Sequence, residues 1–215
     1  MIFHSPETKE QLEALGIPVL VERSSYEPEP LGRMEWIKLY GLLTGRLAEA
    51  EAFFAEQTAR VSALEAADTG RTAAFFYLSP NGYAVVRKPG DYISRMIDMA
   101  GGTYILPPES DTEENALSTM QMEMESFYEA ARDADVLFYN STIDGRIDTV
   151  EELLRKSALL SDFKAVREGN VWCTEQNVFQ QTTGIGGMIV DMNRILTGDA
   201  GDGSDLTFFH HVDGS

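Results

Sequence analysis

The feature that most constrains the fold is a regular alternation of strand and helix signals between Arg71 and Gly198. Each short apolar run with strand composition is followed by a loop and then by apolar residues at helical spacing. These runs cover 73–79, 103–106, 135–140 and 171–174. Strands that alternate with helices form a largely parallel sheet that is covered on both faces and joined by right-handed crossovers. The sequence therefore predicts a Rossmann-like α/β lobe over 70–198.

The chain before this lobe is too short to close a core of its own. Residues 7–15 are predicted to form a helix that ends at Gly16, and 18–22 a compact apolar strand. A proline-containing loop over 23–33 follows, and helical spacing resumes over 34–43. We therefore expect 1–45 to be the end of a second α/β lobe.

Two further segments flank the predicted lobe. An approximate helical stripe runs from Leu47 to Leu64 in a region rich in Ala, Glu and Gln, so 46–69 is expected to be one long helix connecting the two lobes. Residues 199–215 are rich in Gly and Asp, and we expect them to form a flexible tail.

The formal net charge of the 215-residue chain is −18, and this acidity excludes some partners. An acidic surface repels phosphate backbones and anionic headgroups, so neither nucleic-acid binding nor a role on a membrane surface is expected. A cationic ligand or partner fits the charge better, although an acidic surface also serves solubility alone. No apolar stretch is long enough for a membrane span, and the first residues lack the basic-then-apolar pattern of a signal peptide.

Metal and thiol chemistry find little support in the composition. Cys173 is the single cysteine, which excludes an intramolecular disulfide and a thiolate cluster, and we expect it to be buried as a small apolar residue. His4 lies at the terminus, and His210 and His211 lie in the predicted tail. No metal site and no resident cofactor are therefore predicted, and any iron should arrive already chelated.

Ligands of open parallel sheets bind beyond the carboxyl ends of the strands, so the loops that follow the strands form the candidate site. These loops are 23–33, 80–91, 107–120, 141–149 and 175–184. The residues in and beside them offer amphipathic rings and hydrogen-bonding groups suited to recognition. The candidate ligand-binding residues are Tyr26, Arg33, Trp36, Tyr83, Arg87, Tyr92, Thr142, Asn177, Phe179 and Gln180.

Arg87 is the candidate for holding an acidic group of a ligand, such as a carboxylate, catecholate or phosphate; solvated surface charge is the alternative. Trp36 is placed either at the cleft or against the sheet, and Trp172 in the core. The run Gly184–Gly187 before the last helix is interpreted as a structural turn rather than a phosphate cradle, because the nucleotide-binding spacing is absent.

No catalytic residues are predicted. The candidate loops contain no His to act as a base near neutral pH, no Ser in a nucleophile elbow and no thiol. A protein that binds without chemistry is therefore favoured over an enzyme.

Several segments resemble the substrate-binding proteins of iron-siderophore and cobalamin (class III) ABC importers. Residues 15–21 and 30–37 look like the end of the N-terminal lobe of such proteins, and 134–140, 166–174 and 180–184 look like parts of the C-terminal lobe. The similarity extends to about Gly198. It implies two α/β lobes joined by a rigid helix, with the ligand between them, and a chain that lacks most of the N-terminal lobe.

The resemblance also implies a function and partners. A chelated iron (siderophore), haem or corrinoid would be captured between the lobes and delivered to the subunits of an ABC permease. The protein would be extracytoplasmic, in the periplasm or held at the cell surface by a lipid anchor that this chain does not contain. One carboxylate on each lobe would meet permease arginines, and Glu151 or Glu152 is the candidate on this lobe.

Two alternatives remain open at this stage. An α/β enzyme or metallocofactor-assembly protein of related two-lobed fold would need Cys or His ligands that face the cleft. A bare interaction domain would bind no small ligand at all, and the side chains of Tyr83, Arg87 and Phe179 would then have no role in uptake.

Overall fold

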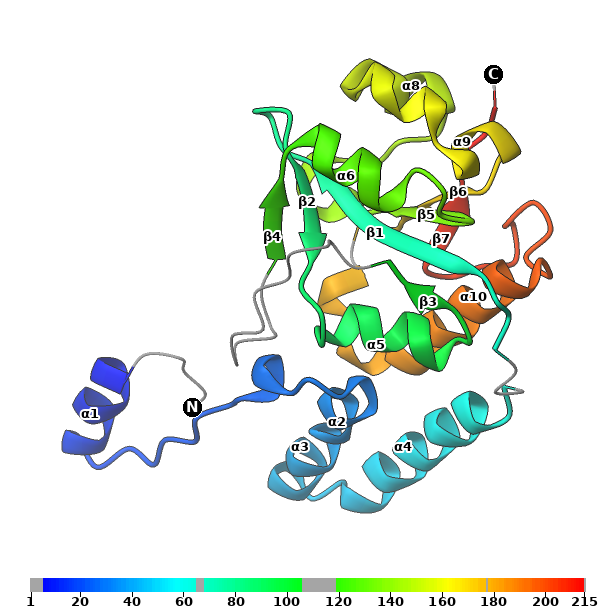
Figure 1. The fold of residues 1–215 in the computed structure, drawn as a ribbon. Coiled ribbons are helices and arrows are strands. Elements are labelled where there is room, and N and C mark those ends of the chain that lie inside the picture. The colour runs from blue at the N-terminus through cyan, green and yellow to red at the C-terminus, as the bar shows by residue number, and fades with distance from the viewer. Residues whose placement is uncertain (1–5, 65–67, 106–118, 177, 215) are drawn as a thin grey trace.

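The computed structural model describes residues 6–64, 68–105, 119–176 and 178–214 and contains a mixed open sheet with helices on both faces (Figure 1). The strands are β1 (Thr72–Leu78), β2 (Ala84–Arg87), β3 (Thr103–Tyr104), β4 (Thr119–Met122), β5 (Val136–Tyr139), β6 (Val171–Thr174) and β7 (Phe209–His211). Their order across the sheet is β4-β2-β1-β5-β6-β7, and β3 pairs with β1 outside this path. The α/β class predicted from the alternation of strands and helices is confirmed.

The centre of the sheet is parallel, as expected. β1 pairs in parallel with β3 and with β5, and β5 pairs in parallel with β6. Alternate residues of β1 enter opposite cores: Ala73 and Phe75 face one, and Ala74 and Phe76 the other. A strand buried on both faces must be apolar along its whole length, which explains why these strands appear in the sequence as continuous hydrophobic runs.

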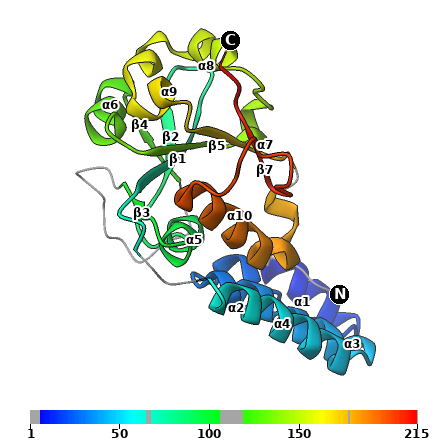
Figure 2. The ribbon, with the colours of Figure 1, turned by 90° about the vertical axis from the view of Figure 1, so that its right-hand side faces the viewer.

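Helices cover both faces of this sheet. The α-helices are α1 (Pro6–Ala14), α2 (Pro30–Glu35), α3 (Ile37–Thr44), α4 (Leu47–Ser62), α5 (Tyr92–Met99), α6 (Met124–Ala131), α7 (Ser141–Asp144), α8 (Val150–Lys156), α9 (Lys164–Glu168) and α10 (Ile185–Thr197). The 3₁₀ turns are η1 (Ser24–Tyr26), η2 (Ala158–Asp162), η3 (Val178–Gln180) and η4 (Thr182–Gly184). Figure 2 shows α5 and α10 on one face and α6, α8 and α9 on the other.

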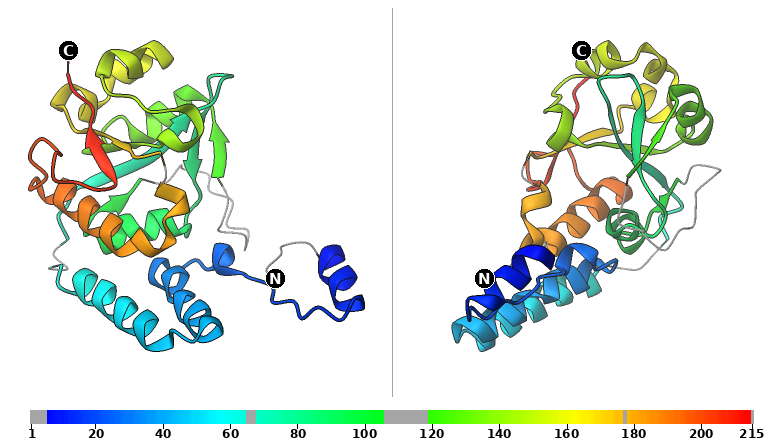
Figure 3. Two further views of the ribbon diagram at one scale, coloured as in Figure 1. Left: turned by 180° about the vertical axis from the view of Figure 1, so that it is seen from behind. Right: turned by 90° about the vertical axis from the view of Figure 1, so that its left-hand side faces the viewer.

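The N-terminal helices form a separate layer. α2, α3 and α4 lie beneath α5 and α10, whereas α1 stands apart (Figures 1 and 3). Glycines allow close helix packing within this layer and against α10. A Cβ at Gly41 of α3 would lie 2.6 Å from Cβ of Ala50 on α4, and one at Gly186 of α10 would lie 2.8 Å from Oε1 of Gln57 on α4. α4 therefore packs directly on α10.

β2 and β7 run antiparallel to the other described strands, so the sheet is mixed while most of its strands share one direction, as expected. β2 pairs with β1 and with β4, and β7 pairs with β6. Residues 80–91, expected to be one loop, consist of a tight turn at Gly82, where φ is 83°, followed by β2. Most of the expected loop 107–120 lies outside the described residues, and its end belongs to β4.

The expectation that 199–215 is a flexible tail is wrong for the described part of that segment. Phe209 and Val212 are 1% and 0% exposed, and β7 extends the sheet beyond β6. The carboxylate of Asp191 on α10 also accepts hydrogen bonds from the backbone amides of Thr207 and Phe208, each at 2.9 Å. Most of the Gly and Asp residues of this segment lie at 199–205, in the turns before β7.

Two predicted N-terminal elements also differ. The structure assigns no strand to 18–22, where Leu20 alone forms a bridge. The helix expected over 46–69 is present as α4 but ends at Ser62, and 65–67 lie outside the described residues. Within the described ranges, no helix combines the length and apolarity needed to cross a bilayer.

The packing of β7 generates a stability prediction. Phe209 packs against Phe138 of β5 with tilted rings whose centroids are 5.2 Å apart, so Phe209→Ala should lower the free energy of unfolding by about 3–5 kcal/mol. Asp205→Ala, an exposed position in the preceding turn, should stay within about 0.5 kcal/mol of the unchanged protein. Urea unfolding measures both. Equal, small effects of the two substitutions would show that β7 does not belong to the folded unit.

Candidate functional site

Four of the predicted ligand-binding residues come together where α2 meets the sheet domain. Arg33 comes from α2, Arg87 from the end of β2, Tyr92 from the first turn of α5, and Phe179 from η3. α2 packs on α5, α10 and η4, which brings these distant segments into contact. With Asp91, which the sequence analysis did not select, we call these residues the arginine–aromatic cluster.

The backbone around Arg87 is held by a buried tyrosine on a neighbouring strand. The hydroxyl of Tyr104 donates to the carbonyl oxygen of Arg87 at 3.0 Å and accepts from its amide at 3.1 Å. The chain then turns through Pro89 and Gly90, with φ of 78° at the glycine, and α5 begins. Asp91 caps that helix, because its Oδ1 accepts from the amide of Ile93 at 2.9 Å.

The guanidinium of Arg33 lies on the face of Tyr92. Its Cζ is 3.8 Å from the ring centroid, a cation–π contact. Nε donates to the carbonyl oxygen of Glu27 at 2.7 Å, and Nη2 to that of Ser25 at 2.6 Å. These bonds hold the charged group in one orientation.

The guanidinium of Arg87 lies among three aromatic rings. Its Cζ is 4.7 Å from the centroid of Phe179 and 5.9 Å from those of Phe75 and Tyr92. Nη1 is 3.5 Å from Oδ2 of Asp91, and the Arg87 side chain is 14% exposed. Two arginines are therefore fixed beside apolar surface, an arrangement that suits a ligand with a flat or apolar body and an ionised acid group.

Burial shifts the ionisation of this cluster. It raises the pKa of Asp91, which Arg87 opposes, and it raises the pKa of Tyr92 to about 12. Burial also lowers the pKa of Arg33, an effect that the nearby Arg87 reinforces. Tyr92 is therefore a neutral ring at physiological pH.

The space enclosed by the cluster is small. A cavity of about 20 Å³ is lined by Arg33, Tyr92 and Phe179 together with residues of η4 and α10. This volume is about that of one water probe, so a larger ligand would lie against the outer side of the cluster.

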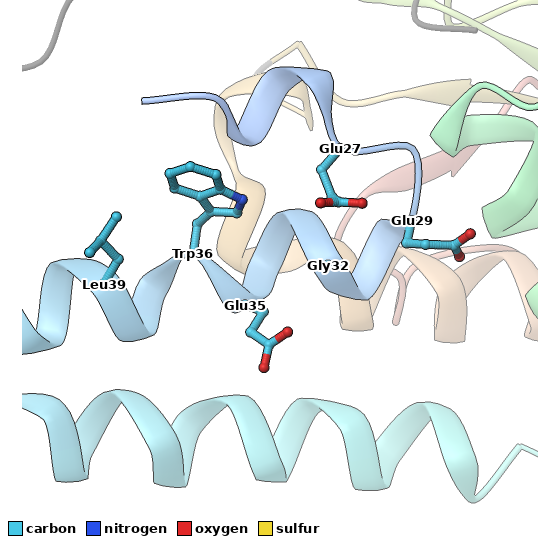
Figure 4. Close-up of a pocket in the computed structure, with 6 residues that line it drawn as sticks. All are labelled: Glu27, Glu29, Gly32, Glu35, Trp36 and Leu39. Atoms are coloured by element: carbon cyan, nitrogen blue, oxygen red, sulfur yellow. The ribbon is translucent and has the colours of Figure 1, made fainter. Parts of the chain in front are cut away.

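A larger open pocket of about 440 Å³ lies along α2 and α3 and is lined by Glu27, Glu29, Gly32, Glu35, Trp36 and Leu39 (Figure 4). Its carboxylates do not converge. Glu35 points to the opposite side of the helix from Trp36, and Glu29 points away from both. Glu35 pairs with Lys38 and Glu29 with Arg95. Trp36 thus borders a pocket, but one separate from the arginine–aromatic cluster.

The other predicted ligand-binding residues lie outside the cluster. Tyr26 is 55% exposed beside Arg23. Tyr83 immediately precedes β2, at the opposite end of that strand from Arg87. Thr142 donates to Asn140 at 2.7 Å at the start of α7. Gln180 is exposed on η3, and Asn177 lies outside the described residues. A role for any of them in binding stays a prediction.

The remaining predictions concern metal, thiol and glycine chemistry. Among the described residues, no group of three or more His, Cys, Asp or Glu is arranged to hold a metal ion. Cys173 is fully buried, and burial raises its pKa to about 11. Only Gly184 precedes α10, and Gly186 and Gly187 lie in its first turn, so the predicted structural turn before the last helix is wrong for these two residues. A Cβ at Gly184 or Gly187 would lie 2.7 or 2.6 Å from the ring of Phe208, so these glycines allow that ring to pack closely.

Asp91, Phe75 and Tyr104 were missed by sequence reasoning. Asp91 precedes a helix and looks like an ordinary cap, and the other two lie inside strands. The spacing Arg87-x-x-x-Asp91 was the one available signal, but it gains meaning only once β2 and α5 are known to meet at a sharp turn.

The sequence matches a known protein family and a longer relative. A family model described as "Periplasmic binding protein" matches residues 2–178. An uncharacterised lipoprotein of Methanocaldococcus jannaschii is 26% identical, and the alignment covers 91% of this chain and 46% of that protein. The chain thus spans less than half the length of that relative.

Solved structures show the same fold. One from Saccharomonospora viridis, described as an ABC-type Fe³⁺-hydroxamate transport system, has a TM-score of 0.65 and 24% identity, covering 90% of this chain and 66% of that one. A periplasmic heme-binding protein from Roseiflexus has a TM-score of 0.66 and 20% identity, and the match covers 92% of this chain and 73% of that one. A periplasmic heme-binding protein from Vibrio cholerae has a TM-score of 0.68 and 18% identity, and the match covers 90% of this chain and 72% of that one.

The buried ring of Tyr92 gives a pH prediction. An unfolded tyrosine ionises near pH 10, and the folded pKa is higher, so the stability associated with the neutral ring is fully present below pH 10 and is lost as the pH rises to about 12. Tyr92→Phe should reduce that loss by roughly 2–3 kcal/mol. Urea unfolding between pH 9 and 12 measures it. Parallel pH profiles for the variant and the unchanged protein would contradict burial of the Tyr92 hydroxyl.

Proposed function

The chain belongs to the periplasmic binding protein family, and from this premise we propose that it forms part of the ligand-binding wall of a solute-binding protein serving an ABC importer. The proposed ligand is a chelated iron (siderophore), haem or corrinoid, which the protein passes to a permease. The proposed location is outside the cytoplasm, in line with the family and with the lipoprotein relative.

The observation that carries this proposal is the arginine–aromatic cluster. Iron chelates and tetrapyrroles combine a wide apolar surface with acidic groups, and the cluster offers both kinds of partner. Tyr92 and Phe179 present rings, while Arg33 and Arg87 are held as fixed cations beside them. The names of the solved structures with the same fold, which refer to Fe³⁺-hydroxamate and heme, point to the same ligand class.

A related α/β enzyme or cofactor-assembly protein finds less support. That function needs Cys or His ligands facing the cleft, and Cys173 is fully buried in β6. Both described histidines already contact protein groups. Nε2 of His210 lies 2.9 Å from the carbonyl oxygen of Ile147, and Nε2 of His211 lies 2.7 Å from that of Gly169.

Ligand titration tests the proposed function. The chain is titrated with haem, a ferric catecholate, a ferric hydroxamate and cobalamin, and we expect at least one to bind at micromolar concentration. Arg87→Met keeps the apolar stem but removes the charge, so it should weaken binding of an acidic ligand by roughly tenfold to a hundredfold. Arg155→Met, an exposed arginine of α8, serves as the matched control and should leave affinity unchanged. Failure of all four ligands to bind would remove the proposed ligand class.

Docking on the permease is proposed to use Glu151 on α8. The two candidate carboxylates differ in their contacts. Glu152 accepts hydrogen bonds from the amides of Asp148 and Thr149 and completes a capping box with Thr149, whereas the side chain of Glu151 is exposed. A carboxylate already engaged in capping is less available to an arginine of a partner.

The two glutamates give a paired prediction. Glu151→Gln should lower permease-dependent uptake several-fold without changing ligand affinity or stability, because it removes one exposed charge. Glu152→Ala should lower the free energy of unfolding by about 0.5–2 kcal/mol, because it removes half of the capping box. Uptake in a reconstituted system and urea unfolding distinguish the two effects. Unchanged uptake with Glu151→Gln would exclude that residue from docking.

A further inference from the structure

Asp91 is a buried carboxylate with one oxygen left over. Its side chain is 1% exposed, and Oδ1 is used to cap α5. Oδ2 has no hydrogen-bond partner among the described residues, and its charged neighbour is Nη1 of Arg87 at 3.5 Å. A buried carboxylate that is not fully hydrogen-bonded is costly, so its presence beside the arginines asks for a functional reason.

The charge balance of the arginine–aromatic cluster gives a functional reason for keeping Asp91 there. Within the arginine–aromatic cluster, two guanidinium groups, those of Arg33 and Arg87, stand against one carboxylate, that of Asp91, so the cluster itself has one positive charge in excess. Glu27 acts on Arg33 more weakly than Asp91 does, and its side chain lies against Gly32 on α2. The tyrosines that face Asp91, Tyr92 and Tyr104, are neutral because burial raises the pKa of each.

We infer that Asp91 is a specificity-determining residue that restricts the arginine–aromatic cluster to ligands presenting a single ionised acid group to it. One acid group neutralises the excess positive charge. A second one is repelled by Asp91, and that repulsion is poorly screened because the carboxylate is shielded from water. The inference rests on the proposed function for the place where the ligand binds, and it narrows the ligand to one that offers a monoanion at this point.

The inference predicts what removing the charge should do. Asp91→Asn keeps an oxygen that can accept from the amide of Ile93, so the cap of α5 and the fold are retained. The variant leaves two uncompensated arginines and should accept a dianion. At the separations of a shared site, one unit charge changes affinity on the order of tenfold or more.

The experiment uses three aromatic probes of similar size and different charge: benzamide, benzoate and phthalate. Each is titrated into the unchanged chain, Asp91→Asn and Asp98→Asn, with binding followed by NMR of the Tyr92 and Phe179 ring signals. Asp98 is an exposed carboxylate later on α5 and matches the change in charge. We expect the unchanged chain and Asp98→Asn to prefer benzoate. Asp91→Asn should shift the ratio of affinities towards phthalate by about tenfold, with benzamide unaffected.

Two results would overturn the inference. One is an equal phthalate-to-benzoate ratio in Asp91→Asn and the unchanged chain, and the other is the absence of any shift of the Tyr92 and Phe179 signals with benzoate at millimolar concentration. Neither result bears on whether iron chelates, haem or corrinoids bind, which their own titration decides. A tenfold shift in probe preference without chelate binding would retain the role of Asp91 and reject the proposed function.

Discussion

Burial of β1 on both faces is the constraint on which the rest of the structure depends. Thr72–Leu78 pairs with β2, β3 and β5, and its alternate residues fill two separate cores. Such a strand needs helices on each side, and α5 with α10 and α6 with α8 and α9 provide them. Because β1 is central, the segments that meet around it have fixed positions relative to one another.

The arginine–aromatic cluster is a consequence of that arrangement. The hairpin after β1 reverses the chain, so β2 carries Arg87 back along β1 to a point opposite Phe75. Tyr104 on β3, which also pairs with β1, then binds the backbone of Arg87. The guanidinium thus stands on rigid elements, and the N-terminal layer adds Arg33, which lies on the ring of Tyr92.

The cluster concentrates positive charge in a strongly acidic chain. Burying two guanidinium groups is unfavourable unless they have interaction partners. Here the partners are aromatic faces, backbone carbonyl oxygens and one carboxylate. Stacking leaves the charges intact, whereas full pairing with carboxylates would neutralise them.

The sequence by itself determined the α/β class and the central strands, because strands buried on both faces must be apolar along their length; β6, at Val171–Thr174, has the predicted bounds. It also named Arg33, Arg87, Tyr92 and Phe179 as candidates, since they follow strands or begin helices. Only the tertiary structure decided which of the ten candidates meet. β2, β4 and β7 are only three or four residues long, and in β4 polar and apolar residues alternate. Their local sequence therefore does not predict a strand, and their strand conformation depends on pairing with neighbours distant in the sequence. For the same reason the sequence could not show that a strand separates Tyr83 from Arg87, or that the buried Asp91 both caps α5 and pairs with Arg87.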